Sequence, residues 1–182
     1  MKDNPYVFEL DQEQFDIQEL RDIFLRREKQ KLEDPYYEEH NRLVIDGPYL
    51  LSLQMEYAFF GDIYNIYTMD KSLPPHIDTD RKCTINFPLW DCDTSETVVY
   101  EMPEHGFVDN SWSYPLSDPI NKSSSKEAYR FTLTQPVLFN VEYPHEVLIK
   151  DSSSTRISFS WGINEMSFAS TKKVFQRRRK ML

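Results

Sequence analysis

Glycine is scarce in this chain. The 182 residues contain four glycines, and each of them stands alone in the sequence. Phosphate-binding loops and dinucleotide fingerprints need closely spaced glycines, and a serine nucleophile elbow needs a glycine on either side of the serine. The sequence therefore excludes the common nucleotide-binding motifs and the nucleophile of α/β-hydrolases.

Cysteines and long apolar runs are also few. Cys83 and Cys92 cannot form a disulfide framework, and their spacing fits no zinc or redox motif. The longest uncharged apolar stretch, residues 131–141, is too short and too polar to span a bilayer. The chain begins Met-Lys-Asp-Asn-Pro and shows no apolar signal region. These features predict a cytoplasmic protein with no membrane partner.

The charge is predominantly negative and unevenly distributed. The formal net charge is −9, but residues 172–182 hold six basic residues and no acidic one, which leaves −15 for residues 1–171. Because an acidic body repels phosphate backbones, we do not expect nucleic acid as a general partner. We expect residues 172–182 to be a solvated basic tail; contact with an acidic partner or RNA is the alternative.

The composition suits one globular domain. Hydrophobic residues make up 40% of the chain and aromatic residues 14%, which is enough for a core, and no linker divides residues 1–182. The clearest helix is predicted at about 11–32, with Asp11 as its cap. Its apolar positions fall on one stripe that includes Leu20, Ile23 and Phe24.

The remainder of the chain has a β-rich character. Short runs with strand composition are separated by Pro, Asp, Asn and Ser. The expected strands are residues 43–45, 49–53, 57–68, 82–88, 97–100, 129–133, 137–141, 146–149 and 156–161. Many short strands with little helix between them predict a mainly β antiparallel sandwich or barrel. Residues 109–126 are expected to form a long loop.

Two histidines have neighbours that suggest chemistry. In an extended segment, His76 and Asp78 leave the same face with Cα atoms about 6.5–7 Å apart, so both can bind one metal ion. His145 follows 69 residues later, after Pro144. On its own, a His-x-Asp pair is a weak signal, because it also occurs by chance.

An arginine accompanies the second histidine. Arg156 lies eleven residues after His145 and starts an otherwise apolar strand. Two antiparallel strands joined at residues 150–155 bring Arg156 back beside His145, with Ser158 on the same strand face. An inward-facing arginine needs an anionic partner. Two histidines and an aspartate are the facial triad of non-haem Fe(II) oxygenases, which leaves three metal positions open.

The combined pattern resembles a known superfamily. His76-x-Asp78, His145 and Arg156-x-Ser158 are similar in order and spacing to the motif of the Fe(II)/2-oxoglutarate-dependent dioxygenases. Upstream, residues 65–67 (Asn-x-Tyr) resemble a motif of the alkylated-base demethylases of that superfamily. The resemblance implies a double-stranded β-helix (jelly roll, cupin-like) over about 43–165, with the N-terminal helix supporting its major sheet.

The resemblance also implies cofactors and a reaction. Fe(II) would be held by a His-Asp-His triad, while 2-oxoglutarate chelates the iron and pairs with an arginine; oxygen would take the last position. The implied metal ligands are His76, Asp78 and His145, and the implied 2-oxoglutarate contacts are Arg156, Ser158, Tyr67 and Asn65. Succinate and CO2 would be released. Because halogenating relatives have a small residue in place of the aspartate, Asp78 favours hydroxylation, or demethylation through hydroxylation.

Two questions stay open at this stage. The alternative to an enzyme is a non-catalytic jelly-roll protein that binds a metal or ligand, or one whose histidines are core residues and whose Arg156 meets a structural carboxylate. The substrate class is also open between a peptide, including a prolyl peptide, and a small molecule. A nucleobase substrate is less favoured because the body lacks a basic surface. Specificity is expected to lie in residues 90–96 and 109–126.

Overall fold

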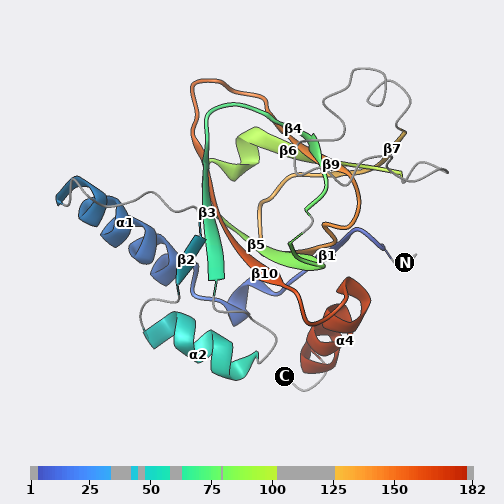
Figure 1. The fold of residues 1–182 in the computed structure, drawn as a ribbon, viewed down its shortest axis with the longest axis horizontal. Coiled ribbons are helices and arrows are strands. Elements are labelled where there is room, and N and C mark those ends of the chain that lie inside the picture. Colours follow the sequence, from blue (N-terminus) through green and yellow to red (C-terminus); the bar gives the residue numbers. More distant parts are fainter. Residues whose placement is uncertain are drawn as a thin grey trace.

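The computed structural model describes residues 4–33, 42–44, 48–57, 63–78, 80–101 and 126–179. Two antiparallel sheets form its centre (Figure 1). The major sheet contains β1 (Val7–Glu9), β8 (Val137–Phe139), β5 (Cys83–Trp90), β10 (Arg156–Ile163), β3 (Ile63–Met69) and β2 (Arg42–Val44), in that order. The minor sheet contains β4 (Leu73–His76), β9 (His145–Ile149), β6 (Ser95–Tyr100) and β7 (Glu127–Phe131).

The strand order confirms the expected mainly β fold. From β3 to β10 the chain places β3, β5, β8 and β10 in the major sheet and β4, β6, β7 and β9 in the minor sheet. The consecutive pair β6 and β7 is the only step that stays within one sheet among these described strands. This alternation between facing sheets is the winding of a double-stranded β-helix, the jelly-roll arrangement of two antiparallel sheets.

Helices cover the major sheet on the side opposite the minor sheet (Figure 1). The core there combines strand residues such as Phe159 and Trp161 with Leu20 and Ile23 of α1 (Ile17–Glu33). The predicted stripe of this helix is thus buried, and the expected N-terminal supporting helix is present. A second buried cluster, which includes Val99 of β6 and Phe139 of β8, lies between the sheets.

The start of the first helix differs from the prediction. Asp11 accepts a hydrogen bond from the Glu13 amide and caps the short 3-10 helix η1 (Gln12–Gln14). The chain is extended at the next residue, Phe15, so the α-helix begins only at Ile17. Asp16 caps it, because its carboxylate accepts from the amide three residues later. The predicted end of this helix at Asp34-Pro35 lies outside the described residues.

One expected strand is a helix. Residues 49–53 were assigned strand character, but they lie within α2 (Pro48–Glu56). Leu50 and Leu53 are buried while Leu51 is half exposed, which is the spacing of one helical face and not the alternation of a strand. The strand prediction for this segment is therefore wrong.

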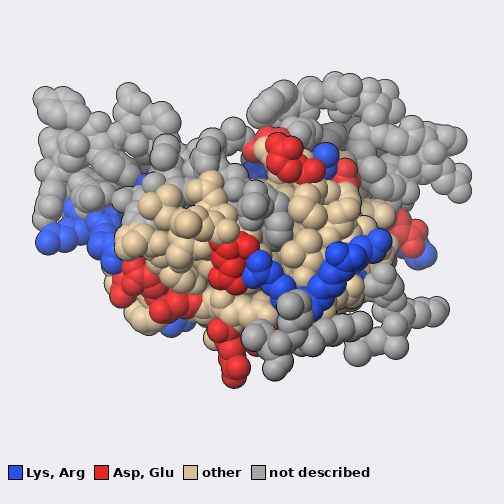
Figure 2. All heavy atoms as spheres, turned by 90° about the horizontal axis from the view of Figure 1, so that it is seen from below, with Lys and Arg blue, Asp and Glu red and all other residues tan. Residues whose placement is uncertain are grey.

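The basic C-terminal segment is mostly helical. The helix α4 (Phe168–Arg179) buries Lys172 and Phe175, so the expectation of a solvated tail is wrong for these two residues, whereas Lys173, Gln176 and Arg177 are exposed. Arg178 pairs with Glu56 of α2 and ties the two helices together. In Figure 2, Lys and Arg side chains form a row on the lower face of the molecule, next to acidic side chains. None of the described helices is long and apolar enough to cross a membrane.

Candidate active site

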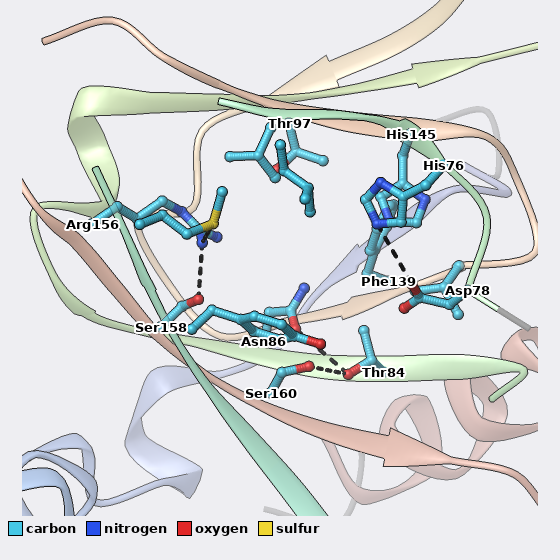
Figure 3. Close-up of a pocket in the computed structure, with 15 residues that line it drawn as sticks. His76, Asp78, Thr84, Asn86, Thr97, Phe139, His145, Arg156, Ser158 and Ser160 are labelled. Atoms are coloured by element: carbon cyan, nitrogen blue, oxygen red, sulfur yellow. Dashed lines mark hydrogen bonds and ion pairs between the residues drawn. The ribbon is translucent and has the colours of Figure 1, made fainter. Parts of the chain in front are cut away.

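A cavity of about 230 Å³ lies between the two sheets (Figure 3). Histidine and aspartate side chains stand at one end of it and Arg156 at the other. The wall between them is mixed: hydroxyl and amide groups project from the major sheet, and apolar side chains such as Val147 come from the minor sheet. The cavity therefore joins a cluster of metal-ligating groups to a buried cation.

Strand pairing brings the two predicted histidines together. In the β4–β9 pair, His76 lies directly opposite His145, and their ring centroids are 4.3 Å apart. Asp78 follows two residues after β4, with its Oδ1 atom 3.5 Å from Nε2 of His76. One ligand atom from each of the three residues lies within 4.8 Å of the others. This spacing suits a single metal ion bound by all three.

Backbone carbonyls fix the orientation of both imidazole rings. Nδ1 of His76 lies 2.8 Å from the Pro74 carbonyl oxygen, and Nδ1 of His145 lies 2.9 Å from that of Tyr143. A carbonyl only accepts, so each Nδ1 carries a proton, and Nε2 is the nitrogen left to bind a metal. Such second-layer bonds set the tautomer of metal-ligating histidines.

Burial also keeps His145 in its ligating form. The residue is 5% exposed. Burial, reinforced by the neighbouring His76, lowers the pKa of His145 to about 4. The imidazole is consequently neutral at pH 7, as a metal ligand must be.

Arg156 is a buried cation without an anionic partner in the described part of the chain. Its Nη1 donates to Ser158 Oγ at 2.9 Å and to the Met69 sulfur at 3.4 Å. Its Nε is buried and has no hydrogen-bond acceptor within the ranges that the structure describes. Burial lowers the pKa of Arg156. The alternative in which Arg156 is a core residue requires a carboxylate of the protein paired with it. No such pair is found among the described residues.

The two-residue period of β10 explains how this strand serves two surfaces. Arg156, Ser158 and Ser160 line the cavity. The residues between them turn the other way, and Phe159 and Trp161 pack in the core beneath the helices. Alternation of polar and apolar residues along one strand thus places the site on one face and the core on the other.

The upstream Asn-x-Tyr pair is only partly at the cavity. Tyr67 lies opposite Ser158 and lines the cavity. Burial raises the pKa of Tyr67, and the positive charge of Arg81 opposes this rise. Asn65 lies opposite Ser160 and is buried, but it is not among the cavity-lining residues. The other predicted site residues all line this one cavity.

Sequence reasoning missed the polar floor of the cavity. Thr84, Asn86 and Ser160 line it together, and Thr84 Oγ1 lies 2.7 Å from Ser160 Oγ (Figure 3). The signal was present, because Thr84 and Asn86 alternate with Ile85 and Phe87 in a segment predicted to be a strand. Polar residues at every second position of a buried strand indicate a polar cavity wall.

Of the two segments expected to set specificity, one is described by the structure, and it does not line the cavity. Residues 90–96 are absent from the cavity lining. Trp90 packs on Phe24 of α1, and Glu96 pairs with Arg130 and Lys150. The other segment, residues 109–126, lies outside the described residues except for its last one.

Comparison with known proteins gives structural likeness only. No protein-family model and no curated protein sequence matches the chain. Among solved structures, the chain is similar to the non-heme alpha-ketoglutarate-dependent epimerase SnoN from nogalamycin biosynthesis (TM-score 0.48, 11% identity), covering 88% of this chain and 79% of that one. It is also similar to a Pseudomonas putida prolyl-4-hydroxylase (TM-score 0.43, 13% identity), covering 82% of this chain and 83% of that one. The strand order by itself shows the double-stranded β-helix, and His76, Asp78 and His145 form a His-x-Asp…His group in its cavity.

Proposed function

We propose that the protein is an Fe(II)- and 2-oxoglutarate-dependent dioxygenase that hydroxylates a peptide or a small molecule. One observation carries the proposal: a single cavity joins the His-Asp-His cluster to a buried guanidinium that lacks an anionic partner among the described residues. A dicarboxylate with a 2-oxo group uses both ends of such a cavity. A metal alone does not account for Arg156.

The donor set fits Fe(II). Two imidazole nitrogens and one carboxylate oxygen, grouped at one end of a cavity, are the ligands of non-haem iron oxygenases. His76, Asp78 and His145 would hold the ion. Fe(II) bound there with 2-oxoglutarate and oxygen supplies the oxidising power to convert a C–H bond to an alcohol, with release of succinate and CO2.

The far end of the cavity fits the distal carboxylate of 2-oxoglutarate. Arg156 would bind that carboxylate through its planar fork, and Ser158, already bonded to Nη1, would keep the guanidinium in place. Arg156 itself is buried, and apolar residues, including Leu73 and Val147, also line the cavity. An ion pair shielded from water is stronger than an exposed one.

The presence of Asp78 at the triad supports hydroxylation over halogenation. Its carboxylate lies within ligand distance of the two imidazoles and takes the position that a halide needs. The position of Tyr67 in the wall beside this carboxylate supports a further, orienting contact to the cosubstrate.

The test is cosubstrate turnover by the purified protein. We expect the protein, loaded with Fe(II) without oxygen and then given 2-oxoglutarate and air, to form succinate slowly even without its substrate. His76→Ala, Asp78→Ala and His145→Ala should each abolish succinate formation and stoichiometric Mn(II) binding, with circular dichroism unchanged. Asp151→Ala, which alters an exposed turn after β9, is the matched control and should behave as wild type.

Two results would contradict the proposal. Wild-type Mn(II) affinity in any two of the triad variants would show that the triad is not the metal site. If the protein binds Mn(II), but the Fe(II)-loaded protein forms no succinate in the presence of a broad set of peptides, amino acids and nucleosides, it is a non-catalytic binding protein. A mass increase of one oxygen atom in one of these compounds would identify the substrate class.

A further inference from the structure

Arg81 connects the metal-ligating carboxylate to its surroundings. It lies between β4 and β5, and its side chain is 8% exposed. Its Nε donates to Asp80 Oδ1 at 2.8 Å, and its Nη2 donates to Asp80 Oδ2 at 3.2 Å. This two-point pairing fixes the plane of the guanidinium.

The same guanidinium faces the second oxygen of Asp78. Nε of Arg81 lies 3.4 Å from Asp78 Oδ2, whereas Asp78 Oδ1 lies 3.5 Å from Nε2 of His76. The two oxygens of this carboxylate thus have separate neighbours. One is directed at the imidazole cluster, and the other is held by a fixed positive charge.

The backbone of β10 provides the space that Arg81 occupies. A Cβ atom at Gly162 would lie 3.3 Å from Cδ of Arg81 and 3.6 Å from its Nη1. The amide of Lys82 donates to the Ile163 carbonyl at 3.0 Å, which secures the Arg81 segment to this strand. Glycine at position 162 therefore lets the arginine stem lie directly on the strand.

We propose that Arg81 is a positioning residue that holds Asp78 Oδ2, so that Asp78 binds the metal through Oδ1 alone. This inference rests on the proposed function, because it concerns the same metal site. A carboxylate that binds through one oxygen leaves three positions of a six-coordinate ion open, while one that binds through both oxygens leaves two. Chelation by 2-oxoglutarate together with oxygen binding requires three.

Tyr67 extends the connection to the cosubstrate end of the site. The positive charge of Arg81 acts on its hydroxyl group, and Tyr67 is one of the cavity-lining residues. Arg81 thus lies next to the proposed metal ligand Asp78 and also acts on a residue of the cavity wall.

The experiment uses Co(II), whose visible absorption depends on coordination number. In wild type, Co(II) titration gives a reference dissociation constant and spectrum. Arg81→Gln should raise the Co(II) dissociation constant by about 10- to 100-fold, the usual cost of losing a second-layer partner, and should change the spectrum. Arg81→Lys keeps the positive charge but lacks the planar guanidinium. Its Co(II) dissociation constant should therefore lie between those of wild type and Arg81→Gln.

Two further variants separate positioning from folding. Gly162→Ala leaves every charge in place but crowds Arg81. It should therefore change the Co(II) spectrum in the same way as Arg81→Gln does, with a smaller loss of Co(II) affinity. Arg130→Gln is the matched control, because Arg130 also pairs with two carboxylates, on the outer surface of the minor sheet, and its Co(II) binding should equal wild type.

The outcomes distinguish this inference from the proposed function. If wild type binds no Co(II), both the metal site and the role of Arg81 are wrong. If wild type binds Co(II) and Arg81→Gln keeps the same affinity and spectrum, even with a lower melting temperature, Arg81 is only a structural residue. Should Arg81→Gln fail to fold, Gly162→Ala decides: a wild-type spectrum and affinity in that variant would overturn the positioning role.

Discussion

At the scale of single residues, Arg156 is hard to explain by folding stability alone. Burying an unpaired cation lowers the stability of the fold. In a buried ion pair, removal of one partner commonly lowers the free energy of unfolding by about 3–5 kcal/mol. Only one hydroxyl and one thioether contact its Nη1, and its Nε has no acceptor among the described residues. A bound carboxylate would offset this cost, which agrees with the proposed role of Arg156 in binding 2-oxoglutarate.

Replacement of Arg156 should therefore weaken the binding of 2-oxoglutarate and leave the binding of the metal unchanged. A buried guanidinium–carboxylate pair contributes on the order of 2–5 kcal/mol by truncation, at about 1.4 kcal/mol per tenfold change. Arg156→Ala should raise the 2-oxoglutarate dissociation constant of the Mn(II)-loaded protein by about 30-fold or more. Arg156→Lys should recover part of the loss, because it keeps the charge without the planar fork. Calorimetric titration measures the dissociation constants of both 2-oxoglutarate and Mn(II).

The control variant is Arg130→Ala, which should change neither the 2-oxoglutarate nor the Mn(II) dissociation constant. Loss of melting temperature in Arg156→Ala, together with an unchanged 2-oxoglutarate constant, would make Arg156 a structural residue. An equal loss of Mn(II) affinity would instead show that the variant disturbs the triad.

At the scale of elements, the sequence predicts strands well and helices less well. The segments of β5, β8 and β10 were predicted because apolar, β-branched and aromatic residues alternate with others or fill a buried strand. Residues 48–56 also carry a run of leucines, but leucine favours helices and Pro48 stands at the first helical position. That start signal was the information that the strand prediction overlooked.

The C-terminal helix shows why a charge run is an incomplete guide. Phe168 and Phe175 are seven residues apart and share a helical face with Lys172. Lys172 is buried because its Nζ donates to the Asn4 carbonyl and lies over the rings of Phe8 and Phe168. Asn4 and Phe8 come from the other end of the chain, so no local pattern predicts these two contacts.

The packing of α4 can be tested at its buried aromatic residue. Phe175 is 1% exposed and contacts the rings of Phe15 and Tyr57. Phe175→Ala should lower the free energy of unfolding by about 3–5 kcal/mol, through lost burial and a cavity. Urea unfolding measures this change. Arg177→Ala, on the exposed face, should stay within about 0.5 kcal/mol of wild type.

A loss below about 1 kcal/mol for Phe175→Ala would show that α4 is not packed on the core as described. Because Phe175 lies in the helix-side core, away from the cavity, the variant should keep wild-type Mn(II) affinity under folding conditions.

At the scale of the whole molecule, the site is divided between the two sheets. The two histidines come from paired strands of the minor sheet, whereas Arg156 and Ser158 come from β10 of the major sheet. The motif residues were predictable from sequence because their types and order are distinctive. The carbonyls behind the histidines, the Arg81–Asp78 contact and the orphaned Nε of Arg156 were not, because each depends on packing between distant segments.

This division predicts that metal and cosubstrate stabilise the fold cooperatively. Under the proposed function, 2-oxoglutarate would link Mn(II) bound to the triad to Arg156 of the major sheet. Without the metal, 2-oxoglutarate would have only Arg156 to bind. At a free concentration about 100 times its dissociation constant, a ligand adds about 2.7 kcal/mol, and each kcal/mol raises Tm by roughly 2–4 °C for a domain of this size. Adding 2-oxoglutarate to the Mn(II)-loaded protein should thus raise Tm by about 5–10 °C, but to the metal-free protein by less than about 2 °C.

Succinate and Arg156→Ala provide the controls for this thermal measurement. Succinate has the distal carboxylate but lacks the 2-oxo group, so its effect should depend little on Mn(II). Arg156→Ala should retain the shift caused by Mn(II) and lose the increment caused by 2-oxoglutarate. Strictly additive shifts in wild type would mean that the two ligands bind independently, and the cavity would then not hold one ligand spanning both sheets.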